Sequence, residues 1–308
     1  MNLANPETYS EDGRISTSKL QESYNKLSGL GWQSEIIAIQ DGFSITAFTT
    51  PLIGNSPVKS LWILGGIHGE EPAGPNAFST QIEAINNLAK EGIPIVFIPL
   101  LNPLGYSRDW RYENEKRDFR LGHSVGNAEH LLLNNEGKKR IDSPQSQTAK
   151  QILKWVTKTI SEYQPDLVFD HHEDRVTEIY PQGDPRNLTS CYVYLSGNST
   201  KGVDIAKGVN QILKNSGLPV VDNGTTRFGE EIVDGIVANV SDGSIDEFFA
   251  SEKYFDTNTQ KIVSKHPAQV VLVVETTVPF DNSIPLTKRQ TAHEEIIKSY
   301  GNFWKRLK

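Results

Sequence analysis

Cysteine is almost absent from this chain of 308 residues, which contains Cys191 and no other. A single cysteine excludes an intrachain disulfide, a zinc site made of cysteines alone and an iron–sulfur cluster. Any metal that this protein binds must therefore be held by histidine and carboxylate side chains. The chain offers seven histidines for this purpose.

Basic residues and long apolar runs are also scarce. The 31 Lys and Arg are outnumbered by 38 Asp and Glu, and the net charge of −7 argues against nucleic acid or an anionic membrane as a partner. The first residues lack the basic and apolar regions of a secretion signal, and no window reaches the roughly 18 apolar residues of a membrane span. We therefore expect a cytoplasmic protein with a small-molecule substrate, and no sequence signal indicates its oligomeric state.

Apolar runs and helical patterns alternate along the chain. A helical pattern at 16–27 precedes two strand-like runs that are joined by Asp41 and Gly42, a pair typical of hairpin turns. Further strands are expected at 61–64, 95–98, 167–169, 192–195 and 270–274, and further helices at 72–90, 146–163, 199–216 and 287–307. This order predicts an α/β fold with a mixed, mostly parallel sheet and helices on both faces.

We expect a single domain that spans residues 1–308 and includes the N-terminal helix and hairpin of residues 1–50, because no linker or repeat divides the chain. The stretch 101–144 is the exception to the regular pattern. It is polar and has no clear period, which is typical of a long functional loop.

Histidines and carboxylates follow three of the expected strands. His68 and Glu71 come after the strand at 61–64, and Glu275 follows the strand at 270–274. The adjacent His171 and His172 come after the strand at 167–169. Ligand sites of open α/β sheets lie at this edge of the sheet, so we expect these side chains to meet there.

Two histidine nitrogens and one carboxylate form a zinc site with a fourth position open for water, as in hydrolytic zinc enzymes. A separate carboxylate near that water can take its proton. Glu275 suits this second role, because a carboxylate at the end of an apolar strand needs a partner or a task. Each motif alone also has a structural interpretation, as a chance His-x-x-Glu or a pair of core histidines. Their occurrence after three strands favours the zinc site.

A rival pattern, Gly-x-Ser-x-Gly, occurs at 122–126 and would make Ser124 the nucleophile of a serine hydrolase. That motif requires a buried strand before the serine. The charged residues at 115–120 cannot form such a strand, so we expect Ser124 to be a loop residue.

The chain from about residue 60 onward resembles the zinc metallocarboxypeptidase family, whose fold is shared by murein-peptide amidases. Residues 68–71 are similar to its His-x-x-Glu motif, 102–105 to its Asn-Pro-x-Gly turn and 170–172 to its Asp-x-His segment. This resemblance implies one Zn²⁺ per chain, held by His68, Glu71 and His172. His171 remains the alternative third ligand, because it also directly follows the apolar strand.

The resemblance extends to the catalytic residues. Glu275-Thr276 is similar to the family's catalytic Glu-Thr pair, which implies that Glu275 is the general base. Arg111 lies in a Trp-Arg dipeptide similar to the one whose arginine stabilises the oxyanion, with Arg108 as the fallback. A guanidinium suits this role, because it is always charged and offers several donors to a developing negative oxygen.

Residues 243–246 are similar to the Gly-Ser-x-Asp segment that lines the family's specificity pocket. Ile245 would then lie at the base of that pocket, where an apolar side chain favours apolar or small groups; alternatively it is a core helix residue. Asp246 has a structural interpretation as the cap of the next helical turn.

The family's Asn-Arg pair, which grips a terminal carboxylate, is missing. Asn127 is a candidate for the amide, and Arg117, Arg120 or Arg227 for the arginine. We expect a zinc-dependent hydrolase that cleaves a peptide or amide bond in a small peptide or an acylated amino acid. The alternatives are an N-acyl amino-acid deacylase resembling aspartoacylase or succinylglutamate desuccinylase, a non-catalytic binding protein and, more remotely, the serine hydrolase.

Overall fold

The computed structural model describes residues 8–308 except 53, 55–56, 116–120, 198–199 and 239–240. Most strands of this part belong to one sheet: β1 (Gln33–Gln40), β2 (Phe43–Thr49), β3 (Val58–Gly65), β4 (Ile95–Ile98), β5 (Tyr163–Arg175), β6 (Tyr192–Ser196), β7 (Asn223–Thr225), β8 (Glu231–Val233), β9 (Ile236–Ala238) and β12 (Val270–Val278). Their order is β1-β2-β4-β3-β5-β12-β6-β9-β8-β7. The strands β10 (Lys253–Asp256) and β11 (Lys261–Ser264) form a separate hairpin.

Parallel strands occupy the centre of the sheet. β4, β3, β5 and β12 are parallel neighbours, whereas β1 and β2 pair antiparallel at one side and β6 pairs antiparallel with β12 at the other. Because β1 and β2 extend the sheet, the N-terminal hairpin is part of the same fold. The predicted α/β fold with a mixed central sheet is confirmed.

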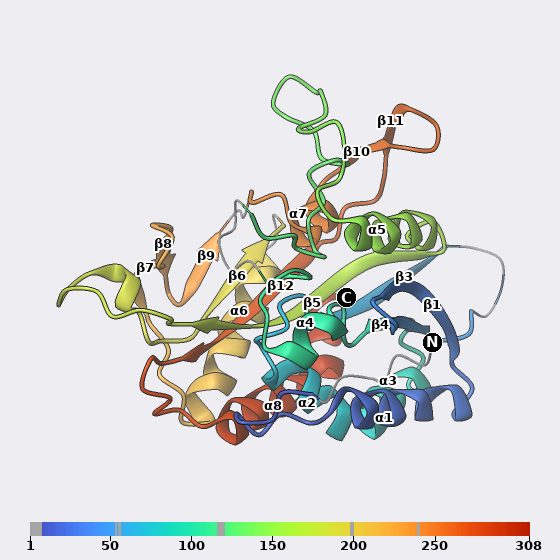
Figure 1. Cartoon of the computed structure of the whole chain (residues 1–308). Coiled ribbons are helices and arrows are strands. Elements are labelled where there is room, and N and C mark those ends of the chain that lie inside the picture. Colours follow the sequence, from blue (N-terminus) through green and yellow to red (C-terminus); the bar gives the residue numbers. More distant parts are fainter. Residues whose placement is uncertain (1–7, 53, 55–56, 116–120, 198–199, 239–240) are drawn as a thin grey trace.

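Helices cover both faces of the sheet (Figure 1). One face carries α1 (Thr17–Gly29), α2 (Ala73–Thr80), α3 (Ile82–Lys90), α6 (Thr200–Asn215) and α8 (Leu286–Leu307), and the other carries α5 (Gln147–Thr159) and α7 (Ile245–Ala250). Two shorter helices, α4 (Pro103–Arg108) and η1 (Pro185–Asn187), lie in connecting segments. Within the described residues, none of the helices has the length and apolar character needed to cross a bilayer.

Alternation along the central strands builds two core clusters. In β3, Leu61 and Ile63 pack with the helices of the α2 and α8 face, whereas Trp62 and Leu64 pack with those of the α5 and α7 face. Successive side chains of a strand point to opposite faces. The same alternation decides which polar side chains of β5 meet each other.

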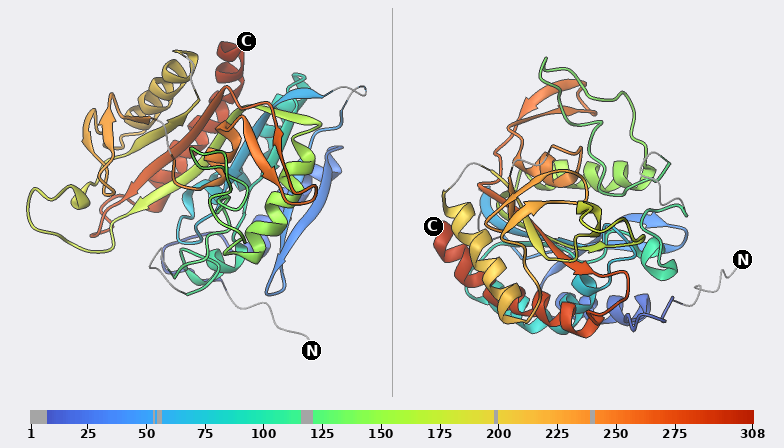
Figure 2. Two further views of the ribbon diagram at one scale, coloured as in Figure 1. Left: turned by 90° about the horizontal axis from the view of Figure 1, so that it is seen from above. Right: turned by 90° about the vertical axis from the view of Figure 1, so that its left-hand side faces the viewer.

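Above the α5 and α7 face, the β10–β11 hairpin and the neighbouring loop project together from the body of the molecule (Figure 1 and the right-hand view of Figure 2). The amide of Phe255 donates to the carbonyl of Leu131 with 2.8 Å between the two atoms. The ammonium of Lys139 lies 4.6 Å from the centre of the Phe255 ring. These contacts hold part of the stretch 101–144, which the sequence predicts to be irregular, against the β10–β11 hairpin.

The structure corrects several predicted boundaries. The expected helix at 72–90 is two helices, α2 and α3, that meet at Gln81. The segment at 101–144 contains the short helix α4. β5 and β12 run past the predicted strand ends into polar sequence, and their pairing continues as far as Arg175 opposite Val278. His171, His172 and Glu275 therefore lie inside strands.

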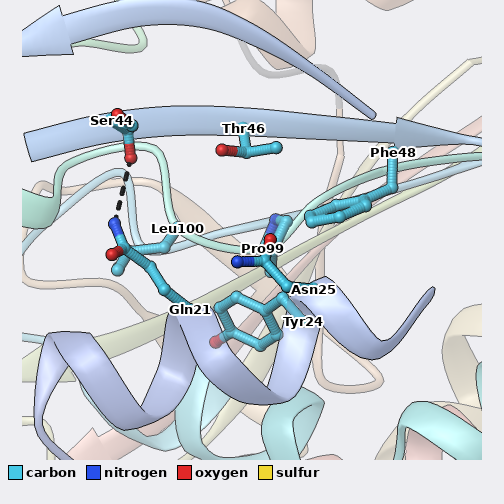
Figure 3. A pocket seen from close by; sticks show the side chains of 8 residues that line it. All are labelled: Gln21, Tyr24, Asn25, Ser44, Thr46, Phe48, Pro99 and Leu100. Carbon is cyan, nitrogen blue, oxygen red and sulfur yellow. Dashed lines mark hydrogen bonds between the residues drawn. The ribbon is translucent and has the colours of Figure 1, made fainter. Parts of the chain in front are cut away.

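The β1–β2 turn has the predicted hairpin geometry. Asp41 and Gly42 have φ angles of 46° and 88°, which are typical of a type I′ turn. A small pocket lies between α1 and β2, where Gln21 donates to the carbonyl of Ser44 (Figure 3). Its volume is about 10 Å³, so it holds at most about one water and carries no ligand site.

Substitution of Trp62 tests the packing between the sheet and the layer formed by α5 and α7. Its fully buried ring lies 4.9 Å from that of Phe249 and 6.3 Å from that of Trp155. Trp62→Ala should lower the free energy of unfolding in urea by about 3 to 5 kcal/mol, because the cavity cannot fully collapse. The control Ile179→Ala, at a side chain 72% exposed, should change it by less than about 0.5 kcal/mol. Equal effects would contradict this description of the core.

Candidate metal centre

The last six residues of β5 are polar and alternate between the two faces of the sheet. Val168 packs into the core of the α5 and α7 face, and Phe169 into that of the opposite face. Continuing this alternation places Asp170, His172 and Asp174 on the α7 side, and His171 and Glu173 on the α2 and α8 side. The two adjacent histidines therefore point in opposite directions.

His172 meets two side chains from the loop that connects β3 to α2. The Nδ1 atom of His68 lies 2.8 Å from Oε1 of Glu71, and Nδ1 of His172 lies 2.9 Å from Oε2 of the same carboxylate. The two Nδ1 atoms are 3.2 Å apart. We call His68, Glu71 and His172 the three-ligand cluster, because one donor atom from each lies within 4.8 Å of the others.

His171 contributes to a separate buried network. Its Nδ1 atom lies 2.7 Å from Nδ1 of His293 on α8, and its Nε2 atom contacts the hydroxyl of Tyr300. Burial lowers the pKa of His171 well below its usual value, and His293 adds to this effect. The geometry thus separates the two candidates for third ligand: His172 lies in the cluster and His171 does not.

A close backbone contact fixes the loop that carries His68 and Glu71. A Cβ atom at Gly69 would lie 2.0 Å from the carbonyl carbon of Gly105 at the start of α4. No residue with a side chain fits there. The buried guanidinium of Arg14 also donates to the carbonyl of Gly69 over 2.9 Å, so the N-terminal segment braces the same loop.

The charges of the three-ligand cluster suit a divalent cation. Burial alone would lower the pKa of His172, but the carboxylates of Asp170 and Glu71 outweigh it and raise this pKa well above its usual value. Burial likewise favours a neutral Glu71, yet His68 and His172 hold its pKa well below the usual range. Both shifts come from the attraction between the carboxylates and the imidazole rings. Two imidazole nitrogens with one carboxylate are also a donor set that zinc prefers.

A carboxylate stands behind His172. The Oδ2 atom of Asp170 lies 3.1 Å from Nε2 of His172, the ring nitrogen opposite the one that faces Glu71. Ligating histidines commonly have such a partner, which fixes the ring orientation and the tautomer. Asp246 lies close to this pair, because Asp170, His172 and Asp246 also bring one donor atom each within 4.8 Å of one another.

Glu275 lies beside the cluster on the neighbouring strand. It pairs with His172 in the β5–β12 register and with Tyr192 in the β6–β12 register, so the three residues share one face of the sheet. Burial raises the pKa of Glu275 well above its usual value, and although His172 opposes this effect, Glu71 and Asp174 reinforce it. A carboxylate with a raised pKa is suited to take and return a proton.

Arg111 reaches the cluster and Arg108 does not. Nη1 of Arg111 lies 3.0 Å from Oε1 of Glu71 and 3.4 Å from Oε1 of Glu70. By contrast, the guanidinium of Arg108 stacks on Trp110 and lies 3.7 Å from Asp41 in the β1–β2 turn. Arg108, the alternative candidate for stabilising the oxyanion, is therefore held beside the β1–β2 turn and not at the cluster.

Glu70 connects Arg111 to a neighbouring cleft. Its Oε2 atom lies 3.9 Å from Nη1 of Arg175, which also pairs with Asp109 at 3.1 Å. Arg175 and Asp109 line a cleft of about 440 Å³, whose other side includes Phe280 and Asn282. Charged side chains thus run without interruption from the cluster to this cleft.

The predicted substrate contacts Asn127 and Ile245 are brought together by backbone pairing between 126–128 and 243–245. The amide of Ile245 donates to the carbonyl of Gly126 over 2.8 Å, and Asn127 bridges to Ser244. Ile245 has no exposed surface and packs in the core of the α5 and α7 face, which agrees with its structural interpretation. The buried Oδ1 of Asn127 has no hydrogen-bond partner among the described residues.

The interpretation of Asp246 as a helix cap is wrong. Ser244 is the N-cap of α7, and its side chain accepts a hydrogen bond from the amide of Glu247. Asp246 lies within the first turn and is buried, which raises the pKa of its carboxyl well above the usual value, and the nearby Asp170 adds to this shift.

Ser124 lies in a turn, and its hydroxyl accepts a hydrogen bond from the amide of Gly126. No strand leads into it among the described residues around it, so the nucleophile elbow of a serine hydrolase is not formed.

Among the candidate arginines, Arg227 lies near the cluster. Its Nη2 atom lies 2.5 Å from Oδ1 of Asp174, and the hydroxyl of Tyr192 donates to Oδ2 of the same carboxylate over 3.0 Å. Asp174 is two residues beyond His172 on the same face of β5. Arg117 and Arg120 lie outside the described residues.

Sequence reasoning missed several of these groups. Asp170, Asp174 and Glu173 were not assigned a role, nor was Arg289 of α8, which pairs with Glu173. The unbroken run of polar residues at 170–175, directly after an apolar strand, was an available signal for the first two. No sequence signal pairs residues on distant elements.

No protein-family model matches the chain, and no curated protein matches it in sequence. Among solved structures, a candidate metallopeptidase from Shewanella amazonensis SB2B is 21% identical with a TM-score of 0.68, over 92% of this chain and 91% of that one. A candidate metallopeptidase from Shewanella baltica OS155 is 19% identical with a TM-score of 0.68, over 97% and 99%. A metallo-carboxypeptidase from Burkholderia cenocepacia is 12% identical with a TM-score of 0.55, over 97% and 70%. The chain therefore has a carboxypeptidase-like fold, as its motifs predict.

The opposite directions of the adjacent histidines yield a matched test. His172→Ala should weaken zinc binding by more than about 100-fold, because it removes a donor from the cluster. His171→Ala should leave zinc binding nearly unchanged and lower the thermal stability, since it empties a buried site beside Tyr300. Competition with a chromogenic chelator measures the affinities. Zinc loss in the His171 variant with retention in the His172 variant would contradict the assignment.

Proposed function

We propose that this protein is a zinc-dependent hydrolase of peptide or amide bonds, with His68, Glu71 and His172 as the metal ligands. The observation that supports this most is the convergence of two imidazole Nδ1 atoms on one carboxylate, with Glu275 on the adjacent strand. The carboxypeptidase-like fold agrees with it. When bound, zinc polarises a carbonyl group and lowers the pKa of a coordinated water to about 7.

The roles of the other residues follow from their positions. Glu275 accepts a proton from the attacking water and later delivers it to the departing nitrogen, and its raised pKa suits both transfers. Arg111 stabilises the negative charge that develops on the carbonyl oxygen. Its guanidinium already lies against Glu71 and stays protonated, because Glu71 and Glu70 outweigh the effect of burial and raise its pKa. Asp170 holds the ring of His172 in place.

The substrate is a small peptide or an acylated amino acid with a carboxylate near the scissile bond. Arg227 is the cation placed to bind that group, because Asp174 holds it on the same side of the sheet as His172 and Glu275. The Arg227 side chain is 17% exposed, so part of it remains open to a ligand. Arg227 takes the place of the arginine missing from the family's Asn-Arg pair.

Glu275→Gln tests the general base. The amide has nearly the same shape but cannot take a proton, so kcat should fall by about 10² to 10⁴-fold, with zinc content and melting temperature close to those of the wild type. Glu230→Gln is the matched control, because this glutamate accepts hydrogen bonds from Tyr194 and Thr226 and is not part of the cluster. A fully active Glu275→Gln enzyme would exclude Glu275 as the base.

Arg227→Gln tests substrate recognition. Its KM for substrates with a free carboxylate should rise by about tenfold or more, because a charge-assisted contact is lost, while kcat changes less. The control Arg186→Gln removes an exposed arginine paired with Asp184 and should leave both constants unchanged. The substrate panel contains C-terminal peptides, γ-D-glutamyl peptides and N-acyl amino acids. Activity on N-acyl amino acids alone would indicate the deacylase alternative, and an unchanged KM would rule out this role for Arg227.

A further inference from the structure

Behind the three-ligand cluster, on the opposite face of β5, lies a buried ion pair that neither the fold nor the proposed reaction explains. Nε of Arg289 on α8 donates to Oε1 of Glu173 with 2.5 Å between the atoms. The Glu173 side chain has no exposed surface and that of Arg289 is 6% exposed. Two buried charges cost several kcal/mol each in desolvation, so the pair needs further contacts to be tolerated.

Those contacts lead to the loop that carries the ligands. The second oxygen of Glu173, Oε2, accepts a hydrogen bond from the amide of Ala73 over 2.7 Å. Ala73 is the first residue of α2, and its N-cap, Pro72, has no side chain that could satisfy the free amides of the first turn. Glu173 supplies this acceptor from another element. The amide that it accepts from, that of Ala73, is only two residues along the chain from the proposed ligand Glu71.

The backbone of Glu173 also reaches the ligand itself. Its amide donates to Oε2 of Glu71 over 3.2 Å, while its side chain fixes Ala73 on the other side of Pro72. The first turn of α2 presses directly on β5 here, because a Cβ atom at Gly74 would lie 2.8 Å from Cβ of His171. Arg289 in turn donates through Nη1 to the carbonyl of Ile284, which ties the pair to the start of α8.

We propose that Glu173 and Arg289 are positioning residues for the metal centre: their ion pair clamps the start of α2 to β5 and α8, and thereby sets the place of Glu71 relative to His172. This inference rests on the proposed metal site. It assigns no contact with substrate or metal to either residue. The clamp acts through the loop, in the way that outer contacts of metal ligands tune affinity.

Three variants test the clamp. Glu173→Gln removes the charge and leaves Arg289 buried without a carboxylate. The double variant Glu173→Met and Arg289→Met removes both charges with side chains of similar volume, a change that often restores stability, but it leaves Ala73 without its acceptor. Asp166→Asn is the matched control: Asp166 is also a buried carboxylate of β5 paired with a cation, Lys59, but at the other end of the strand.

Zinc affinity by chelator competition and the visible spectrum of the Co²⁺-substituted protein are measured where near-ultraviolet circular dichroism shows each variant to be folded. Glu173→Gln and the double variant should bind zinc about 10 to 100-fold more weakly and show altered Co²⁺ bands. Asp166→Asn should lower the melting temperature without either change.

The decisive comparison is between stability and affinity in the double variant. If its zinc affinity and Co²⁺ spectrum match those of the wild type, the pair is only structural and the inference is overturned. The same conclusion follows if Asp166→Asn weakens zinc binding equally. A wild-type protein that binds no zinc would instead contradict the proposed function, so the two failures are distinguishable.

Discussion

A single strand that carries charge on both faces organises this molecule. The end of β5, which pairs with β12 beyond the last residue of β3, is buried and cannot leave its carboxylates and histidines in contact with bulk water. Each of these groups needs a compensating charge or hydrogen bond, since an isolated charge in the interior is strongly unfavourable. The elements around β5 supply these partners: the β3–α2 loop on one side, and α8 on the other.

The two faces have different partners and therefore different uses. On the α7 side, His172 meets Glu71 and His68, and one carboxylate faces two ring nitrogens. On the α8 side, His171 is satisfied by His293 and Tyr300, and the ring nitrogens have no carboxylate between them. The first arrangement favours a bound cation, whereas the second is a closed, neutral network. Alternation along one strand thus places the three-ligand cluster on one face of the sheet and the His171 network on the other.

The sequence predicts the parts of this arrangement that depend on local pattern. Apolar runs identify the central strands, and the His-x-x-Glu motif identifies the two loop residues that we propose as ligands, because these signals lie within a few residues of one another. The strand ends were placed too early, since pairing with β12 keeps polar residues such as Asp174 in the sheet against their local preference. The choice between His171 and His172 also required the strand to continue, because only then does alternation separate them.

Long-range ion pairs could not be predicted. Glu173 and Arg289 are 116 residues apart, and nothing in either local sequence selects the other. The same holds for Arg227, whose position depends on Asp174 and on the β7–β8 region that carries it. Such pairs follow from the three-dimensional arrangement of the sheet and helices, not from any short motif.

The central claim is that His68, Glu71 and His172 hold one metal ion. The most direct measurement is anomalous diffraction at the zinc absorption edge from crystals of the zinc-loaded protein. The account predicts one strong peak about 2.0 to 2.2 Å from Nδ1 of His68, from Nδ1 of His172 and from a carboxylate oxygen of Glu71. A zinc-loaded crystal with its peak between Asp170 and Asp246, or with no peak at the three-ligand cluster, would contradict it.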